Sequence, residues 1–287
     1  MGGFYPRGGL GNYTASSERK SGVWKWYFEN GQLKTTGELI RGKKNSLWEE
    51  YYSDGTLRNM ITYKYDSNNN LDFSFVANNW INAQKIINKK SPKTKIFKTH
   101  SVRGVVNGNF FTDSSVCLGF IYIIRDPRDI VVSLSKHMGI DTNKAIDIIL
   151  NNNKFMTSSH KVNELVCTWK NNLESWLTFT DVPRLVIRYE DIVENLNKIL
   201  NQLIEFIEKI AKLEIKNKEN KIKNVIKSTN FDILKKEENK RGFKEASNFS
   251  SFFREGKSGQ WLKELTNDQI KLMENKLNKT LKKLNYI

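Results

Sequence analysis

The stretch that decides the fold is Gly119-Phe-Ile-Tyr-Ile-Ile-Arg-Asp-Pro-Arg-Asp-Ile-Val-Val-Ser-Leu-Ser-Lys-His137. It begins with an uninterrupted apolar run, Phe120 to Ile124, which is typical of a strand buried on both faces. Asp126 is a good N-cap residue, and Pro127 fits the first position of a helix, where a missing N–H costs nothing. The sequence therefore predicts a parallel strand that ends at Arg125 and a helix that follows at once.

Arg125 is the first candidate for a binding residue. In open α/β sheets, ligands bind in the crevice at the carboxyl ends of the strands, which is where this pattern places the side chain. An arginine beside a helix N-terminus suits an anion, most obviously a phosphate. The alternative is an ion pair between Arg125 and a neighbouring carboxylate, a common arrangement at strand ends.

The composition indicates a folded protein with anionic partners. The chain has 287 residues, enough for one α/β domain with a small appendage or for two modest domains. Hydrophobic residues make up 38% of it, which favours a packed core over disorder. The net charge of +16 favours a nucleotide, a sulfated or acidic glycan, or nucleic acid as partner, although a lysine-rich composition without function gives the same charge.

Signals for export and membrane insertion are missing from the sequence. Two cysteines, Cys117 and Cys167, are too few for a disulfide framework and fit a reducing compartment. No segment approaches the length of a membrane-spanning helix, and the first residues lack the pattern of a secretory signal. Pro6 stands where an N-myristoylation motif needs Ser or Thr. We therefore expect a cytoplasmic protein without a membrane span.

A short repeat occupies the N-terminal region. Residues 22–33 and 46–57 match at an offset of 24, which pairs Trp24 with Trp48 and Gly31 with Gly55. Each unit alternates aromatic and polar residues up to an Asn-Gly or Asp-Gly dipeptide, a pattern that predicts a β-hairpin. The repeat resembles the variant MORN repeats of bacterial proteins, which form a ribbon of hairpins. That resemblance implies a role in packing or in contact with a protein partner.

The chain divides into three parts. We expect residues 1–21 to be a flexible tail, residues 22–65 to hold the antiparallel hairpin repeat, and residues 73–287 to form an α/β domain, with the polar run 64–72 typical of a linker. In the third part, apolar periodicity predicts strands at 95–97, 120–124 and 184–187 and helices at 79–88, 143–151, 161–179, 192–211 and 212–227. A last helix follows the capping box of Thr266 and Gln269. This alternation is typical of a parallel sheet with helices on both faces.

The segment around Arg125 resembles the 3′-phosphate-binding signature of sulfotransferases that use the donor PAPS (3′-phosphoadenosine 5′-phosphosulfate). In that family, the arginine that ends the strand and a serine on the next helix hold the donor's 3′-phosphate, and they match Arg125 and Ser133. The resemblance covers roughly residues 75–287, with its motifs in the family's order. It implies a P-loop-NTPase-like parallel sheet flanked by helices, with the hairpin repeat as an appendage.

Lys98-Thr99-His100 follows the predicted strand 95–97 and matches a Lys-Thr-His of the same family. Sulfonyl transfer is an in-line displacement that needs a base for the acceptor proton and positive charge on the leaving oxygen. A neutral imidazole suits the base, so the resemblance implies that role for His100. Lys98 suits the charge. The alternative is a hydrogen-bonded structural histidine, the role that we expect for His137, while His160 has a loop pattern.

The segment Phe253-Arg-Glu-Gly-Lys-Ser-Gly-Gln-Trp261 resembles the loop that closes over the 3′-phosphate in this family. The matching residues are Arg254 and Gly256. Two residues depart from the family pattern: Glu255 replaces a lysine and Gln260 replaces an aspartate. The first change puts an anion near a phosphate and predicts weaker binding.

Two further matches concern the nucleotide. Ser228-Thr-Asn-Phe231 resembles the family's adenine-contacting segment, which implies adenine contacts for Thr229 and Phe231. Tyr189 matches a tyrosine near the nucleotide. Plain core packing is the alternative for Phe231 and Tyr189.

One motif of the family has no counterpart. Family members begin with a strand and a Pro-Lys-Ser-Gly-Thr-Thr type of loop, whose backbone N–H groups cradle the 5′-phosphosulfate. The nearest string, Tyr5-Pro6-Arg7-Gly8-Gly9, lacks the preceding strand and the Ser/Thr pair, and the hairpin repeat stands where the loop should be. The loss of that strand predicts a gap in the centre of the sheet. Three outcomes stay open: an active enzyme with a substitute loop, a nucleotide-binding pseudoenzyme, or a compromised domain.

The first functional hypothesis is a PAPS-dependent sulfotransferase that acts on a hydroxyl or amine of a small-molecule or glycan acceptor and needs no metal. The second is an inactive module that binds a nucleotide or a sulfated glycan, while its MORN-like part recruits a protein partner. The third is nonspecific nucleic-acid binding by a lysine-rich face, with affinity that falls steeply with salt. We expect no specific nucleic-acid partner, and no motif identifies the acceptor.

Overall fold

The computed structural model describes residues 21–55, 57–63, 73–90, 94–151, 155–156, 164–243 and 245–287. The chain divides into two compact units. The first unit comprises residues 1–99, 104–116 and 156–164, and the second comprises residues 100–103, 117–155 and 165–287. The predicted tail to residue 20, the linker 64–72, the Tyr5–Gly9 string and His160 lie outside the described residues.

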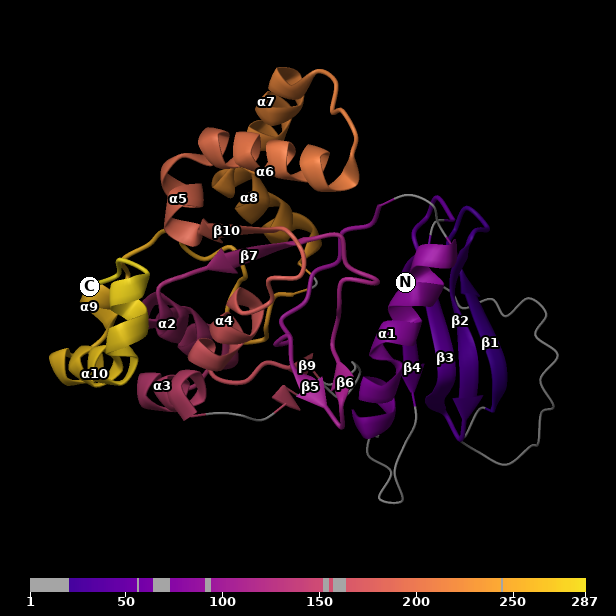
Figure 1. Ribbon diagram of the computed structural model, residues 1–287, viewed down its shortest axis with the longest axis horizontal. Coiled ribbons are helices and arrows are strands. Elements are labelled where there is room, and N and C mark those ends of the chain that lie inside the picture. Colours follow the sequence, from indigo (N-terminus) through magenta and orange to yellow (C-terminus); the bar gives the residue numbers. More distant parts are fainter. Residues whose placement is uncertain are drawn as a thin grey trace. The chain divides into compact units, whose positions relative to one another are not determined.

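An antiparallel sheet dominates the first unit (Figure 1). Its strands, in spatial as well as chain order, are β1 (Gly22–Tyr27), β2 (Leu33–Ile40), β3 (Lys43–Tyr51) and β4 (Leu57–Tyr63). The connections after β1 and β3 contain Gly31 at φ +82° and Gly55 at φ +81°, the left-handed region that glycine enters without strain. The structure thus has hairpins at both of the dipeptides that the repeat singles out.

Trp48 forms the centre of this sheet. Its side chain is 1% exposed, and its ring lies over Gly37 of the neighbouring strand. A Cβ atom at position 37 would lie 2.3 Å from the ring, so only glycine fits there. The indole N–H of Trp48 donates to the carbonyls of Glu38 (2.9 Å) and Asn45 (3.2 Å), beside an irregularity in the β2–β3 pairing.

Helix α1 (Phe73–Lys90) packs along β4 and against a small hairpin of β5 (Val105–Val106) and β6 (Asn109–Phe110). The helix predicted at residues 79–88 is therefore confirmed. Gln84 joins the helix to the segment after β6, because its Nε2 donates to the carbonyl of Phe111 (2.7 Å) and its Oε1 accepts from the Thr112 hydroxyl (2.8 Å).

The strand predicted at Lys95–Phe97 is wrong. These residues have no strand pairing in the described structure, and Ile96 and Phe97 are 76% and 53% exposed. The apolar run is only two residues long and is flanked by Lys95 and Lys98, so it has too little apolar surface to fix a buried strand.

A parallel pair of strands forms the centre of the second unit. In this pair, β7 (Phe120–Ile124) and β10 (Arg184–Arg188) are in register from Phe120–Arg184 to Ile124–Arg188. Helix α2 (Pro127–Met138) follows β7 directly, and the Asp126 side chain caps it by accepting from the backbone N–H of Arg128 (2.9 Å). Both predictions from the 119–137 stretch are confirmed. The parallel sheet in the described residues has only these two strands, and because they are direct neighbours, no gap separates them.

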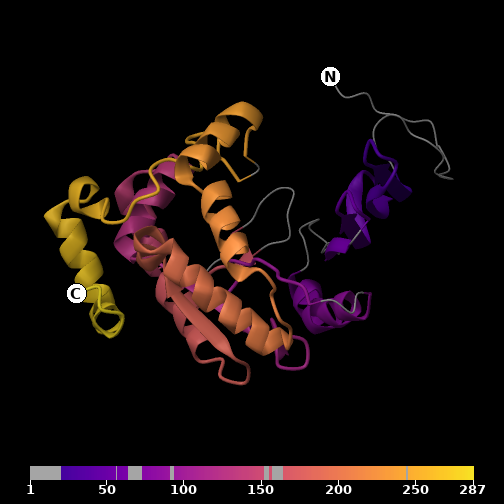
Figure 2. The ribbon, with the colours of Figure 1, turned by 90° about the horizontal axis from the view of Figure 1, so that it is seen from above.

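Helices cover both faces of this pair. The remaining elements are α3 (Thr142–Asn151), β8 (Phe155–Met156), β9 (Glu164–Leu165), α4 (Trp169–Leu177), α5 (Tyr189–Glu194), α6 (Leu196–Ala211), α7 (Lys218–Ser228), α8 (Phe231–Arg241), α9 (Trp261–Glu264) and α10 (Asn267–Lys283). Figure 1 shows α5 to α8 on one side of β7 and β10, and α2 and α4 on the other. In the view of Figure 2, α6 runs along β10.

The main hydrophobic core lies between α2, α3 and α10. Val131, Ala145 and Met273 are fully buried there. The capping box at Thr266 and Gln269 is present, so the predicted start of the last helix is confirmed. Among the described residues, no helix combines the length and the apolar character that crossing a membrane requires.

Three predicted helix boundaries are wrong. The helix predicted over 161–179 starts at Trp169, after the Thr168 N-cap, and Cys167 has a positive φ of 58° that no helix accommodates. The helix predicted over 192–211 breaks at Asn195, whose side chain accepts from the Lys198 N–H and begins a new helix. The helix predicted over 212–227 begins at Lys218, because Lys212 is the left-handed C-cap of α6.

Candidate functional site

Arg125 lies between the end of β7 and the N-cap of α2, as the sequence predicts. Its guanidinium carbon is 4.4 Å from the ring centroid of Tyr189, the first residue of α5. One terminal nitrogen donates to the carbonyl of Lys257 at 3.4 Å. The Nε atom is buried and has no hydrogen-bond partner among the described residues. The side chain is thus held in place by an aromatic ring while part of its donor capacity is unused.

The carboxylates near Arg125 on α2 already have partners. Asp126 forms a fork with Arg128, with Nε–Oδ1 at 3.0 Å and Nη2–Oδ2 at 2.7 Å. Asp129, 1% exposed, accepts from the backbone N–H groups of Gly259 (2.7 Å) and Trp261 (3.1 Å). Arg125 forms no ion pair in the described part of the chain. The alternative reading of Arg125, an ion pair with a neighbouring carboxylate, is therefore not what the structure contains.

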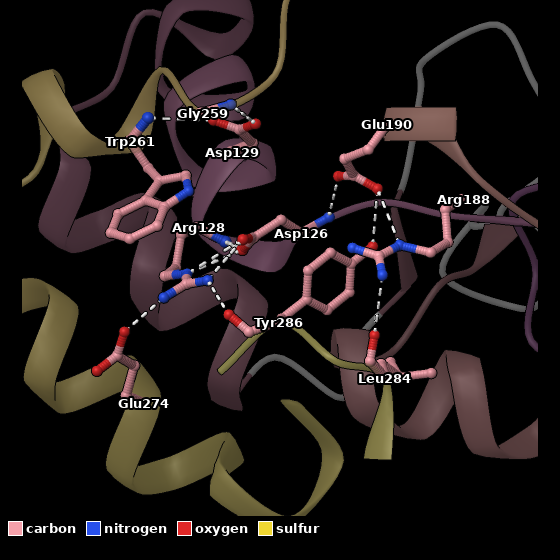
Figure 3. Close-up of polar contacts among 10 residues, drawn as sticks. All are labelled: Asp126, Arg128, Asp129, Arg188, Glu190, Gly259, Trp261, Glu274, Leu284 and Tyr286. Atoms are coloured by element: carbon pink, nitrogen blue, oxygen red, sulfur yellow. Dashed lines mark hydrogen bonds and ion pairs between the residues drawn. The ribbon is translucent and has the colours of Figure 1, made fainter. Parts of the chain in front are cut away.

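Arg128 connects α2 to the C-terminal segment (Figure 3). Besides Asp126, it pairs with Glu274 of α10 and donates to the carbonyl of Tyr286 at 3.0 Å. Its guanidinium carbon lies 3.8 Å from the centroid of the Trp261 ring. Burial alone would lower the pKa of Arg128, but the hydrogen bonds and charges of Asp126 and Glu274 outweigh burial and raise it.

Glu190 forms a second connection to the C-terminal segment. One carboxylate oxygen accepts from the backbone N–H of Asp126 (3.1 Å), and the other accepts from the Tyr286 hydroxyl (3.0 Å) and lies 3.7 Å from Nε of Arg188 (Figure 3). Burial, and after it the charge and hydrogen bond of Glu190, raise the pKa of Tyr286 above its usual 10.0. The phenol is therefore held in its neutral, donating form.

A pocket of about 260 Å³ opens within this network. Its charged lining consists of two guanidiniums, Arg128 and Arg188, and three carboxylates, Asp126, Asp129 and Glu190. Arg125 does not line it. Because the carboxylates outnumber the guanidiniums, this pocket does not suit a phosphate, and any phosphate site at Arg125 is a different one.

Two buried carboxylates hold the loop of residues 252–261. Glu238 of α8, 7% exposed, accepts from the backbone N–H groups of Phe252 (2.6 Å) and Phe253 (2.8 Å). Asp129 holds the other end of the loop through its two bonds to Gly259 and Trp261. Lys235 adds a bond from its ammonium to the carbonyl of Arg254 (3.1 Å). We call Asp129 and Glu238 the loop anchors.

Arg254 is bound to one of the two residues that depart from the family pattern, Gln260. Its Nη2 donates to Oε1 of Gln260 at 2.7 Å, and Nε2 of Gln260 donates to the carbonyl of Lys257 at 3.1 Å. A carboxylate at position 260 would have no donor for that carbonyl. Glu255 lies 4.0 Å from Nη1 of Arg254, and both side chains are partly exposed.

Gly256 and Phe231 contact each other. A Cβ atom on Gly256, which has a φ of +63°, would lie 2.4 Å from the Phe231 ring. That ring also meets Phe253 edge to face at 6.4 Å. Thr229 is used locally, because its hydroxyl donates to the carbonyl of Val225 at 2.7 Å. The structure thus brings Arg125, Tyr189, Phe231, Arg254 and Gly256 into one set of connected elements.

The other predicted residues are less closely connected to this set. Ser133 lies half-buried on α2. Lys98 and His100 are exposed, and the boundary between the two units passes between Thr99 and His100. The His100 carbonyl accepts from Nδ2 of Asn172 at 2.9 Å, which fixes its backbone in the second unit. Lys98 belongs to the first unit, so its pairing with His100 stays a prediction.

Sequence reasoning missed the loop anchors and Lys235. An aspartate in the first turn of a helix and a glutamate in a Lys/Glu-rich helix are both ordinary surface patterns. Their partners lie 130 and 14 residues away in the chain, and no local signal indicates such pairs. In the described part of the chain, no group of three or more His, Cys, Asp or Glu side chains is placed to hold a metal ion.

One comparison with known proteins identifies a family. The model of the sulfotransferase domain matches residues 20–285. No curated protein matches the chain. A solved structure, mouse sulfotransferase SULT7A1 complexed with PAP, matches at 18% sequence identity with a TM-score of 0.43. That match covers 56% of this chain and 57% of the mouse chain, so the chain spans little more than half of that protein's length.

Proposed function

We propose, from the premise that this chain belongs to the sulfotransferase domain family, that it transfers a sulfonyl group from PAPS to a hydroxyl or amine. The acceptor is a small molecule or a glycan. The sulfur–oxygen bond to the donor's phosphate breaks, a bond from the acceptor atom to sulfur forms, and PAP (the desulfated donor) leaves. In this proposal Arg125, Ser133, Arg254 and Gly256 bind the 3′-phosphate, while Tyr189, Thr229 and Phe231 line the nucleoside.

The state of Arg125 is the observation that carries the proposal. A buried guanidinium nitrogen without a hydrogen-bond partner is a donor that a ligand oxygen can satisfy, and Nε of Arg188 is another such donor. The adjacent carboxylates do not supply that partner, because Asp126 is bound to Arg128 and Asp129 to the loop. A phosphate oxygen would satisfy the Nε donor of Arg125 with a charge-assisted bond.

The surroundings of Arg125 also fit a phosphate. The first turn of α2 contributes the positive end of a helix dipole. The 252–261 loop approaches the same guanidinium at Lys257 and carries Arg254 as a second cation. These features support an anion site in the second unit.

For the chemical step we propose His100 as the base and Lys98 as the cation on the leaving phosphate. The acceptor proton goes to the imidazole, and the ammonium offsets the charge that develops on the bridging oxygen. The support is their match to the family's Lys-Thr-His motif.

A second candidate function is binding without turnover, with the hairpin repeat as a contact site for another protein. One observation favours it: the segment before Lys98 forms no strand in the described structure, although the sequence predicts one there. In this case PAP or a sulfated glycan binds and no sulfonyl group moves.

Calorimetry with PAP and a transfer assay with labelled PAPS distinguish the two. The first proposal predicts binding and the release of PAP in the presence of an acceptor mixture of phenols, amines and sugars. Binding with no PAP release would support the second candidate. Absence of PAP binding would contradict both.

A further inference from the structure

An irregularity in the pairing of β1 with β2 lies beside a hollow on the sheet of the first unit. In a regular strand, successive side chains point to opposite faces. Trp26 pairs with Thr35 but Tyr27 pairs with Leu33, so Lys34 is the extra, unpaired residue of β2, and it lines a pocket of about 290 Å³ together with Trp26. Bulges of this kind re-aim side chains and are frequent next to binding sites.

The floor of this pocket is preformed. Trp48 is buried against Gly37, and its indole N–H is bound to two carbonyls. The Trp26 ring lies 5.4 Å from the Trp48 ring at an angle of 37°, which fixes one wall. Tyr27 is 50% exposed and presents ring surface to solvent. A rigid aromatic site of this kind loses little conformational entropy on binding.

Two lysines add positive charge to the lining. The ammonium of Lys44 lies 4.4 Å from the centroid of the Trp48 ring and 4.0 Å from Glu50. Burial lowers the pKa of Lys44, and the charge of Glu50 opposes this effect. Burial thus destabilises the charged ammonium, and a bound anion would stabilise it. Lys34 is the second lysine, and its ammonium lies 5.6 Å from the centroid of the Phe28 ring. The Thr35 hydroxyl donates to the carbonyl of Glu49 (2.9 Å), so it offers a ligand only its acceptor capacity.

We propose that this pocket binds an acidic saccharide, a sugar unit that carries a carboxylate or a sulfate. The C–H face of the sugar ring packs on Trp26. The anionic group binds between Lys34 and Lys44, and a ring hydroxyl donates to the Thr35 oxygen. The volume is just below the roughly 300–1,000 Å³ of small-molecule sites, which suits one or two units of a longer glycan.

The geometry favours a saccharide over other anions. A nucleobase stacks best between nearly parallel rings, whereas the two indole rings that line this pocket, Trp26 and Trp48, are tilted by 37°. An anionic membrane binds clusters of exposed basic residues, whereas one of these lysines is half-buried in a recess. The pocket lies wholly in the first unit, so a saccharide can bind there whether or not the second unit binds PAP.

Calorimetry on the full chain tests the inference. The probes are a sulfated, uronate-containing disaccharide, neutral cellobiose, AMP, sodium sulfate and vesicles with anionic lipid. We expect the sulfated disaccharide to bind and the other probes to bind at least about tenfold more weakly, because only it offers both ring and charge. Trp26→Ala and Lys34→Ala should each weaken binding by about 3- to 10-fold.

Lys25→Ala is the matched control. Lys25 is an exposed lysine between Trp24 and Trp26, so its side chain points to the opposite face, and its removal should leave binding unchanged. Lys34 is exposed, so its variant keeps the test valid if Trp26→Ala fails to fold. Equal binding of cellobiose, tighter binding of AMP, sulfate or vesicles, or unchanged binding by Lys34→Ala would each overturn the proposal.

Discussion

At the scale of single residues, the carboxylates around Arg125 determine what this arginine can bind. Asp126, Asp129 and Glu190 all lie near the end of β7, and any of them could have neutralised it. Each is instead bound elsewhere. Asp126 is bound to Arg128, and Asp129 is bound to the loop backbone. Glu190 accepts from the Tyr286 hydroxyl and from the backbone N–H of Asp126. None of these carboxylates neutralises Arg125, whose guanidinium lies over the Tyr189 ring.

Glu255 is a residue whose replacement should improve the site. Its carboxylate lies 4.0 Å from Arg254 and competes with a phosphate for that cation. Glu255→Lys should tighten PAP binding about two- to fivefold, the range for partly exposed charge pairs. Calorimetry at low salt measures this, with Glu237→Lys as an exposed control on α8. Unchanged or weaker PAP binding by Glu255→Lys would show that Arg254 does not contact the phosphate.

Lys98 and His100 should affect chemistry and not donor binding. Lys98→Ala and His100→Ala are each expected to lower the rate of sulfonyl transfer by about 100-fold or more, while calorimetry still detects PAP binding. His137→Ala, in the last turn of α2, is the control and should retain the rate. Normal turnover by either Lys98→Ala or His100→Ala would refute the role assigned to that residue.

At the scale of elements, the loop anchors position the 252–261 loop. Each buried carboxylate accepts hydrogen bonds from two backbone N–H groups, one with each oxygen. An Asn or Gln side chain in its place has only one oxygen, and its NH2 group would face a backbone N–H donor. Asp129→Asn and Glu238→Gln should therefore loosen the loop and weaken PAP binding about tenfold, since an unsatisfied buried donor costs about 1–3 kcal/mol.

Limited trypsin digestion gives a readout specific to the loop. Cleavage after Arg254 or Lys257 should be faster in both anchor variants, and PAP should slow it. Glu237→Gln, an exposed neighbour of Glu238, should cleave like the unmodified chain. An unchanged cleavage rate at these two sites in both anchor variants would contradict the anchoring role.

Tyr286 makes stability depend on alkaline pH. Its pKa is raised in the folded state, so near pH 10 the unfolded chain loses this proton first, and stability falls as pH rises further. Tyr286→Phe should lower stability at neutral pH by about 1.5–3 kcal/mol, through the lost bond to Glu190, but should reduce the loss above pH 10. Urea unfolding at about pH 8 and pH 11 measures both. If the unmodified chain and Tyr286→Phe lost the same free energy of unfolding between about pH 8 and pH 11, Tyr286 would not be the group that links stability to pH.

The elements that the sequence predicts well are those whose signals are local. Asp126 and Pro127 fix the start of α2, and Thr266 with Gln269 fixes the start of α10, within four residues of chain. The failures have the opposite character. The strand at Lys95–Phe97 depends on a partner strand, and Asn195 breaks a helix although the apolar pattern continues through it. The candidate site follows the same rule: a motif identifies Arg125, but only tertiary structure reveals Asp129 and Glu238.

At the scale of the whole molecule, the chain carries two binding proposals on two separate units. The anion site at Arg125 lies entirely in the second unit, and the aromatic pocket lies entirely in the first. The net charge of +16 favours anions at both, but charge alone does not distinguish PAP from any other polyanion. Specificity must come from particular residues, and the 3′-phosphate is the group that distinguishes PAP from AMP.

A thermal-shift titration that compares PAP with AMP tests the central claim most directly. If Arg125 binds the 3′-phosphate, PAP at a hundredfold excess over its Kd should raise the melting temperature by roughly 5–10 °C, and AMP at the same concentration should raise it far less. Arg125→Ala should abolish the difference, while Arg241→Ala, an exposed arginine on α8, should retain it. Equal shifts with PAP and AMP, or a PAP shift that survives Arg125→Ala, would contradict the account.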